Sequence, residues 1–559
     1  MPAFLLYNGP IYTLDPEAPR VQALGVRDGR VIASGSEGKV QAAVGGRAEP
    51  INLHGRAVVP ALTDAHVHFV GYALARRELR LEGMADFDTA LLRVAEAAEQ
   101  LPAGAWLTGG GWDHTLWGGR WPRASDLDAL VPGRPVLLVR KDGHSAWANS
   151  RALELAGIGD DTPDPPGGTI QREKKRATGL LLETAVDLLR RHIPAATQEQ
   201  RVAATRDAIV EAHSYGMAGA HIPPGMAQGD AARVLSDLQL LRERGQLKLR
   251  CLAHLGLEGL DEAIWLGIRS GLGDRWLRIG GVKMFSDGSL GSETAEMLSH
   301  YEGRRHLGAA TMTTEALNDA VGRALAGGIA VTIHAIGDAA NRRVLDAIEL
   351  ALSQQSAVSS QQSAAGDELR TADWRLPTAI PNRIEHCQIL HPSDIPRFAR
   401  LGVIASMQPI HATADMEVAD RLWGERCATA YAWRSLQDAG ATLAFGSDAP
   451  VEPLNPWLSI HAAVTRQRPG NIPLTGWYPE QRIDVAAALR GFTSGAAAAA
   501  GASHELGTLA IGKFADLAIL SADPFKIDPS DLHAVAAELT MIEGEIVWEK
   551  RSNTATLER

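Results

Sequence analysis

Four histidines and one aspartate in this sequence stand where short apolar runs end. His66 and His68 close the first run, and residues i and i+2 of an extended strand point the same way, so both could bind one cation. His334, His386 and Asp448 end three later runs. Taken together, these side chains predict a metal site that is built from the ends of several strands.

A lysine, Lys283, lies inside another apolar run, at residues 280–285. Burying a charged amine is costly, so this lysine needs an ion-pair partner or a chemical reason. One such reason is carboxylation, which gives a carbamate whose oxygens can bridge two metal ions. Each residue also has an ordinary explanation when taken alone: a chance His-x-His, a core histidine, a helix-capping aspartate or a buried ion pair.

The elements that must position these residues follow the pattern of an α/β protein. Eight short apolar runs alternate with helix-length amphipathic stretches, at residues 58–66, 217–221, 249–254, 279–285, 329–334, 383–386, 403–407 and 442–448. Eight runs predict a closed (β/α)8, TIM-like barrel, whose active site would lie at the C-terminal ends of its strands.

Other segments predict additions to this barrel. Residues 1–58 and 505–559 both alternate short strands with turns, such as Asp28-Gly29, and are expected to form one small β-sandwich. Residues 59–504 would form the barrel. The interval from about 70 to 215 is too long for one crossover, which predicts an inserted subdomain after the first strand. Residues 353–371, rich in Ser, Gln and Ala, are expected to be a flexible surface loop.

Composition excludes several classes of protein. The formal net charge is −11, and the sequence has no clustered basic patch, so a nucleic-acid surface is not expected. No signal peptide or long apolar segment predicts secretion or a membrane span. Three widely spaced cysteines do not predict disulfides, which fits a cytoplasmic protein. A small-molecule substrate and a homo-oligomer, most simply a dimer, are expected.

The order of these residues along the barrel resembles the amidohydrolase superfamily with a binuclear metal centre. Short motifs are similar to the YtcJ-like branch, which includes N-substituted formamide deformylases. They are DAHVHF (64–69), GHSAWAN (143–149), DPPGG (164–168), SDGSLGS (286–292), HAIGDAAN (334–341), RIEHCQ (383–388), GSDAPV (446–451) and GTLAIGKFADL (507–517). The resemblance covers almost the whole chain.

This resemblance implies hydrolysis of a C–N bond other than a peptide bond (EC 3.5 type), in an amide, formamide, carbamate or cyclic amide. It implies two divalent ions, most simply Zn²⁺, although Mn²⁺, Co²⁺ or Ni²⁺ also suit such ligands. A hydroxide between the ions would attack, and Asp448 would carry its proton to the leaving nitrogen. The implied metal ligands are His66, His68, Lys283, His334, His386 and Asp448.

The inserted subdomain is expected to be a lid, because it leaves the barrel at the mouth of the first strand. It holds five of the chain's thirteen tryptophans. Trp112, Trp117 and Trp147 are predicted to form aromatic pocket walls, and His144 to donate a catalytic hydrogen bond to the substrate. The alternative is that these tryptophans form the core of the insertion itself.

Asp287 and Gln388, in two of the shared motifs, complete the expected substrate pocket. Two other functions stay open. A deaminase of a cyclic amidine or aromatic amine would use similar residues, but such sites usually hold one metal and do not need Lys283. A non-enzymatic binding or regulatory protein could use the same scaffold, although such a protein would be expected to have lost metal ligands.

Overall fold

A computed structural model of the chain describes residues 2–102, 104–141, 144–225, 228–364 and 378–550. The chain divides into two compact units. Unit 1 contains residues 1–69 and 206–559, and unit 2 contains residues 70–205. Among the described residues, no helix is both long and apolar enough to cross a membrane.

Unit 1 is built around an eight-stranded parallel sheet, which confirms the predicted barrel. In order around the sheet its strands are β21 (Leu443–Phe445), β20 (Ile404–Met407), β19 (Arg383–His386), β18 (Val331–Ala335), β17 (Leu277–Phe285), β16 (Arg250–Gly256), β15 (Met217–Ile222) and β8 (Leu62–Asp64). The amide of Ala65 donates to the carbonyl of Phe445 at 2.9 Å. This bond joins the ends of the first and last strands.

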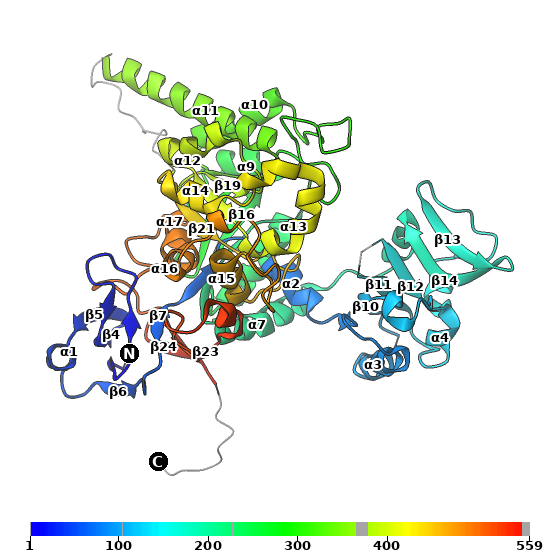
Figure 1. Cartoon of the computed structure of the whole chain (residues 1–559), viewed down its shortest axis with the longest axis horizontal. Coiled ribbons are helices and arrows are strands. Elements are labelled where there is room, and N and C mark those ends of the chain that lie inside the picture. Colours follow the sequence, from blue (N-terminus) through cyan, green and yellow to red (C-terminus); the bar gives the residue numbers. More distant parts are fainter. Residues whose placement is uncertain (1, 103, 142–143, 226–227, 365–377, 551–559) are drawn as a thin grey trace, which may run out of the picture. The chain divides into compact units, whose positions relative to one another are not determined.

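Helices follow the barrel strands along the chain (Figure 1). In α10 (Thr314–Ala326), the side chain of Thr313 accepts the amide of Ala316 and caps the helix. The apolar positions of this helix recur at helical spacing, so one stripe is buried: Leu317, Ala320, Val321, Ala324 and Leu325. Further helices of the barrel part of unit 1 include α8 (Asp230–Glu243), α9 (Leu260–Trp265), α11 (Asp338–Ala364), α12 (Ile395–Leu401), α13 (Pro409–Trp423), α14 (Trp433–Asp438), α15 (Pro456–Thr465), α16 (Val485–Arg490) and α17 (Ala496–Ala499).

Two details differ from the sequence-based expectation. Helix α11 continues to Ala364, so residues 353–364 are helical and the expected loop was wrong there; residues 365–371 lie outside the described residues. Ala and Gln favour helices, and no Gly or Pro interrupts this stretch. The first apolar run, residues 58–66, is also divided between two sheets. Its first half, β7 (Val58–Pro60), pairs with strands of a terminal sheet, and only β8 joins the barrel.

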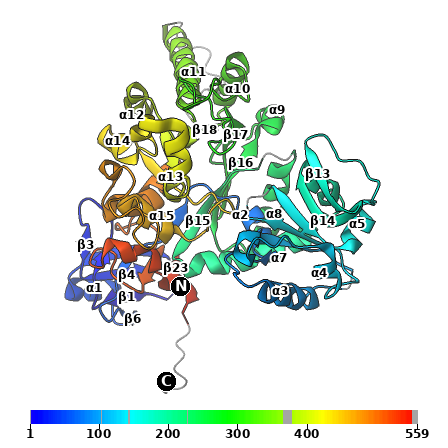
Figure 2. The same ribbon diagram turned by 45° about the vertical axis from the view of Figure 1, so that its right-hand side comes forward.

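The two ends of the chain share a six-stranded sheet. Its order is β24 (Glu545–Glu549), β23 (Ala537–Ile542), β22 (Leu517–Leu520), β7, β2 (Ile11–Tyr12) and β3 (Arg20–Val21). A second sheet contains only N-terminal strands, in the order β5 (Arg30–Gly35), β4 (Ala23–Arg27), β1 (Phe4–Tyr7) and β6 (Glu49–Asn52), with α1 (Glu37–Val44) packed against β4 and β5 (Figure 2). The predicted turn joins β4 to β5, with left-handed φ values at Asp28 (51°) and Gly29 (77°).

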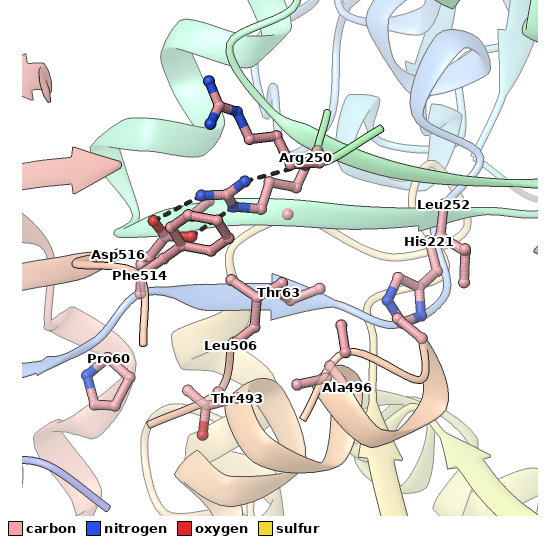
Figure 3. A pocket seen from close by; sticks show the side chains of 18 of the residues that line it. Pro60, Thr63, His221, Arg250, Leu252, Thr493, Ala496, Leu506, Phe514 and Asp516 are labelled. Carbon is pink, nitrogen blue, oxygen red and sulfur yellow. Dashed lines mark hydrogen bonds and ion pairs between the residues drawn. The ribbon is translucent and has the colours of Figure 1, made fainter. Parts of the chain in front are cut away.

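A buried ion-pair cluster ties the barrel to the tail of the chain (Figure 3). Arg250, the first residue of β16, lies 2.6 Å from Asp516 and 2.9 Å from Glu543. Arg250 and Asp516 also line a small cavity of about 60 Å³. Because Arg250 is 8% exposed, its charge depends on these two carboxylates.

Deleting residues 509–559 is therefore expected to give insoluble protein. The deletion removes β22, β23 and β24 and leaves Arg250 buried without its carboxylates, a loss of about 3–5 kcal/mol for the broken pair alone. Because domains are stable by only about 5–15 kcal/mol, the combined loss should abolish folding. The measurement is the soluble yield and thermal unfolding, beside a control that ends after Lys550 and keeps all three strands. A soluble, active deletion variant would contradict this expectation.

Unit 2 is built on a six-stranded sheet of its own. The strands lie in the order β13 (Gly168–Glu173), β14 (Arg176–Glu183), β12 (Ser145–Ala148), β11 (Val136–Arg140), β10 (Leu107–Trp112) and β9 (Leu79–Arg80). The longer helices of this unit include α2 (Phe69–Ala75), α3 (Phe87–Glu99), α5 (Ser150–Leu155) and α7 (Gln198–Ser214), the last of which runs on into unit 1. This unit has a buried apolar core, so it is more than a long loop.

Candidate metal centre

The four histidines and the aspartate meet at the C-terminal ends of the barrel strands. His66 Nε2 and His68 Nε2 each lie 3.5 Å from Asp448 Oδ1. His386 Nδ1 lies 4.0 Å from Asp448 Oδ2. The His334 and His386 rings have centroids 4.6 Å apart. The cluster thus contains His334 and His386 from β18 and β19, and His66, His68 and Asp448 from the segments that follow β8 and β21.

A close contact between the first and last strands sets part of this geometry. The amide of Asp448 donates to the carbonyl of His66 at 2.7 Å. The carboxylate of Asp64 accepts the amides of His66 and Ser447 at 3.0 and 3.1 Å. A Cβ atom on Gly446 would lie 2.5 Å from the amide nitrogen of His66, so only glycine permits this approach. The contact holds His66 beside Asp448.

Two of the candidate ligands have left-handed backbone conformations. The φ angle is 74° at His386 and 60° at Asp448. Such values are uncommon for residues with a Cβ and persist where the surrounding structure enforces them, often at functional sites. At His386 the strand alternation therefore ends, and its ring lines the same cavity as His66.

Each histidine ring has one nitrogen held by an acceptor outside the cluster. The contacts are His66 Nδ1 with Glu385 Oε2 (2.5 Å), His68 Nδ1 with Pro223 O (3.1 Å), His334 Nε2 with Gly288 O (2.9 Å) and His386 Nδ1 with Gln408 Oε1 (2.8 Å). An acceptor at one nitrogen places the ring proton there, which leaves the lone pair of the other nitrogen for a metal.

The protonation states also suit metal binding. Burial lowers the pKa of His68 and of His334 to about 4. Burial likewise lowers the pKa of His66, and that of His386 well below its usual value. All four rings are therefore neutral near pH 7, which is the form that binds metals.

Lys283 lies in the same cavity and is 3% exposed. Burial lowers the pKa of its amine to about 8, although the charges of Glu385 and Asp448 oppose that shift. Its ammonium nitrogen lies 4.9 Å from the centre of the Phe285 ring. This lowered pKa increases the unprotonated fraction of the amine at neutral pH, and only an unprotonated amine can become a carbamate.

These residues fit a divalent cation. His66 Nε2 and Asp448 Oδ1 are buried and have no hydrogen-bond partner among the described residues. His66, His386 and Asp448 offer ligand atoms that all lie within 4.8 Å of one another. Imidazole nitrogen and carboxylate oxygen are the donors that zinc and related ions prefer.

The cluster opens into a cavity of about 370 Å³, and all of its lining residues belong to unit 1. Phe285, Leu290, Ile336 and Val451 contribute apolar surface. Gln388, a predicted substrate contact, lines the same cavity and is 5% exposed. Its Oε1 has no hydrogen-bond partner among the described residues, so it is available to a ligand.

Asp287 has a different environment from the one expected. Its carboxylate accepts the amides of Ile336, Gly337 and Glu296 at 2.8–3.0 Å. Burial raises its pKa to about 7. Because its oxygens already hold the loop after β18, this geometry favours a positioning role for Asp287 over direct substrate binding.

The three predicted pocket tryptophans lie in the core of unit 2. Trp112 and Trp147 are fully buried and Trp117 is 8% exposed. Each indole N–H donates to a backbone carbonyl: Trp112 to Leu138, Trp147 to Arg123 and Trp117 to Met84. Rings enclosed in this way are core residues. The structure therefore favours the alternative that these tryptophans form the core of the insertion over the prediction that they line the substrate pocket.

Trp147→Ala is consequently expected to destabilise unit 2 rather than to change KM. Removing a fully buried indole from a core costs about 3–5 kcal/mol. Thermal or urea unfolding of the variant measures this loss, and Trp121→Ala is the control because Trp121 is 39% exposed. Equal stability of both variants would contradict the core assignment.

His144 also belongs to unit 2, where its side chain is 68% exposed and its Nδ1 lies 2.9 Å from Glu183. Its proposed catalytic role stays a prediction.

Several residues of the site were not predicted from the sequence. Glu385 contacts His66, and Arg383 in turn donates to Glu385. Although burial opposes ionisation, these two neighbours hold the pKa of Glu385 well below its usual value. His411 Nε2 lies 3.4 Å from Asp448 Oδ2. Arg383 and Glu385 could have been found by the argument applied to Lys283, because charged residues inside an apolar strand need a reason.

The chain is similar to several known proteins over most of its length. A model of the amidohydrolase family matches residues 49–548. The chain is 32% identical to the protein YtcJ of Bacillus subtilis (strain 168), over 97% of this chain and 99% of that protein. It is 28% identical to the N-substituted formamide deformylase of Arthrobacter pascens, over 98% of each chain.

Two further similarities concern a plant protein and a solved structure. Protein LONG AFTER FAR-RED 3 of Arabidopsis thaliana is 34% identical, over 95% of this chain and 89% of that protein. An uncharacterized metal-dependent hydrolase from Pyrococcus furiosus has a TM-score of 0.73 and 29% identity, over 94% of this chain and all of that chain. These similarities extend over nearly the full length of the chain.

Proposed function

Because this chain belongs to the amidohydrolase family, we propose that it is a metal-dependent hydrolase of C–N bonds other than peptide bonds. The observation that carries the proposal is the set of four neutral histidines that surround Asp448, each with one ring nitrogen held from outside. A site with all of these ligands argues against a scaffold that has lost its chemistry.

The proposed centre holds two divalent ions, most simply Zn²⁺. His66, His68 and Asp448 would hold one ion, His334 and His386 the other, and a carboxylated Lys283 would join them. Such ions supply hydroxide at neutral pH and polarise a carbonyl. The lowered pKa of Lys283 supports carboxylation, because the neutral amine is the form that reacts with carbon dioxide.

In this proposal Asp448 moves the proton. Its Oδ1 lies beside the ligand histidines, and its Oδ2 lies 3.4 Å from His411. A carboxylate in this place can accept a proton from the attacking water and release it to the departing nitrogen. The products are then a carboxylic acid and an amine, or the ring-opened equivalent of a cyclic amide.

The substrate proposed is a small amide, formamide, carbamate or cyclic amide with a hydrophobic group. The name of the Arthrobacter pascens relative supports the formamide class. Phe285, Leu290, Ile336 and Val451 give the cavity apolar walls that suit such a group, and Gln388 Oε1 can accept a hydrogen bond from a substrate N–H. His144 is proposed as an additional donor to the substrate.

Release of amine from panels of N-formyl, N-acyl, carbamate and cyclic amide compounds tests this function. We expect amine release by protein reconstituted with zinc and none after chelation. Ammonia release from cyclic amidines or aromatic amines, with no amide cleavage, would instead support the deaminase.

Replacing His144 with Ala should lower kcat on one good substrate while the metal is retained. An unchanged kcat would remove His144 from the mechanism.

A further inference from the structure

A fully buried ion pair lies directly behind the metal ligand His66. Glu385 Oε2 is 2.5 Å from His66 Nδ1, and the Nε atom of Arg383 donates to Glu385 Oε1. All three side chains are 0% exposed. Arg383 and Glu385 are two residues apart in β19, so both project from the same face of that strand.

We propose that Glu385, held by Arg383, is a positioning residue that fixes the ring orientation and tautomer of His66 for metal binding. A carboxylate accepts hydrogen bonds but does not donate them, so the ring proton belongs on Nδ1. His66 Nε2 then presents its lone pair toward the cluster, 3.5 Å from Asp448 Oδ1. The proposal rests on the proposed metal centre.

Glu385 differs from the partners of the other three histidines. The hydrogen-bond acceptors of those rings are the carbonyls of Pro223 and Gly288 and the amide oxygen of Gln408, all of which are neutral. The one carboxylate near them, Asp287, lies 3.5 Å from His334 Nε2 and has its oxygens on backbone amides. A carboxylate partner makes the imidazole more basic and strengthens its bond to a metal. His66 is also the most enclosed of the four rings, so it is the ligand whose orientation depends most on its neighbours.

Arg383 keeps the carboxylate in place. Its guanidinium also donates to the carbonyl of Ala65 and to Ser406 Oγ (3.0 Å), and contacts His221 Nδ1 at 2.9 Å. These three partners belong to three different strands or strand ends, so the guanidinium cannot turn without breaking several bonds. With Arg383 on Oε1 and His66 on Oε2, both oxygens of Glu385 are occupied. The carboxylate is therefore held away from direct coordination of the ion.

A purely structural ion pair is the competing explanation, and the chain provides a matched control for it. Glu543 is also buried, at 4% exposure, and lies 2.9 Å from the buried Arg250. It belongs to the cluster that ties the barrel to the tail and does not line the metal cavity. Glu543→Gln therefore removes a comparable carboxylate without touching a metal ligand.

The test measures Zn²⁺ dissociation constants by competition with a chromogenic chelator for the full chain and for Glu385→Gln, Glu385→Asp and Glu543→Gln. Thermal unfolding of the metal-free proteins is recorded beside them. We expect both Glu385 variants to bind Zn²⁺ about 10–100-fold more weakly, since Gln lacks the charge and Asp lacks the reach. Glu543→Gln should lose stability but keep its zinc affinity within about twofold.

Each other outcome overturns the proposal. Equal zinc affinity in the parent and the two Glu385 variants would show that Glu385 does not position the ligand. Loss of cooperative unfolding in both Glu385 variants would assign the pair to stability alone. A parent that binds no zinc would reject the metal centre itself, which distinguishes failure of the proposed function from failure of this inference.

Discussion

Replacing Asp448 with Asn is expected to lower kcat by roughly 10²–10⁴, the usual contribution of a positioned acid–base group. Burial opposes ionisation of Asp448, but the nearby rings of His411, His66 and His386 hold its pKa below its usual value. The native side chain is therefore an ionised proton acceptor near pH 7. Asn keeps the shape and an oxygen donor but accepts no proton, so metal should be largely retained.

The measurement is kcat across neutral pH, with metal content determined on the same samples. Asp394→Asn is a suitable control, because Asp394 is also buried but pairs with Arg342 and Arg397 instead of the histidine cluster. An Asp448→Asn variant with the parent kcat at every pH would remove Asp448 from proton transfer.

Replacing Lys283 with Ala is expected to lower metal content and activity together. The bridging carbamate proposed for Lys283 contributes a ligand to both ions, so its loss should reduce occupancy from about two ions per chain to one or fewer. Added short carboxylic acids should restore part of both quantities, because they can occupy the space of the carbamate. The control is Lys248→Ala, whose exposed amine pairs with Glu545 at the surface. A Lys283→Ala variant with two ions and full turnover would show that the lysine does not bridge them.

The barrel and the places of the candidate ligands on its strands could be predicted because both are local properties of the sequence. Each barrel strand is a short apolar run, and each candidate ligand lies within that run or at its end, as His334 does in β18 and His386 in β19. Parallel strands bring such ends to one side of a sheet whatever the loops between them do. The close approach of Gly446 to His66 follows from the same topology. It could not be predicted, because the sequence does not show which segment packs against a given glycine.

The remaining features depend on contacts between distant segments. Glu385 reaches His66 across 319 positions of sequence, and no periodicity marks such a pair. Trp112 and Trp147 stand in glycine-rich and polar motifs, yet the fold of unit 2 encloses both rings. Helix α11 extended beyond Ser353 because Ala and Gln favour a helix even where no apolar stripe is present. In each case tertiary packing or backbone propensity outweighed the pattern that guided the prediction.

Metal analysis of the purified protein, combined with turnover of one amide substrate, tests the central claim most directly. We expect about two divalent ions, most simply Zn²⁺, per chain. Amine release should stop when a chelator removes these ions and should recover when they are added back. Amine release at the parent rate by protein that contains no metal would contradict a metal-dependent hydrolase at the cluster of His66, His68, His334, His386 and Asp448.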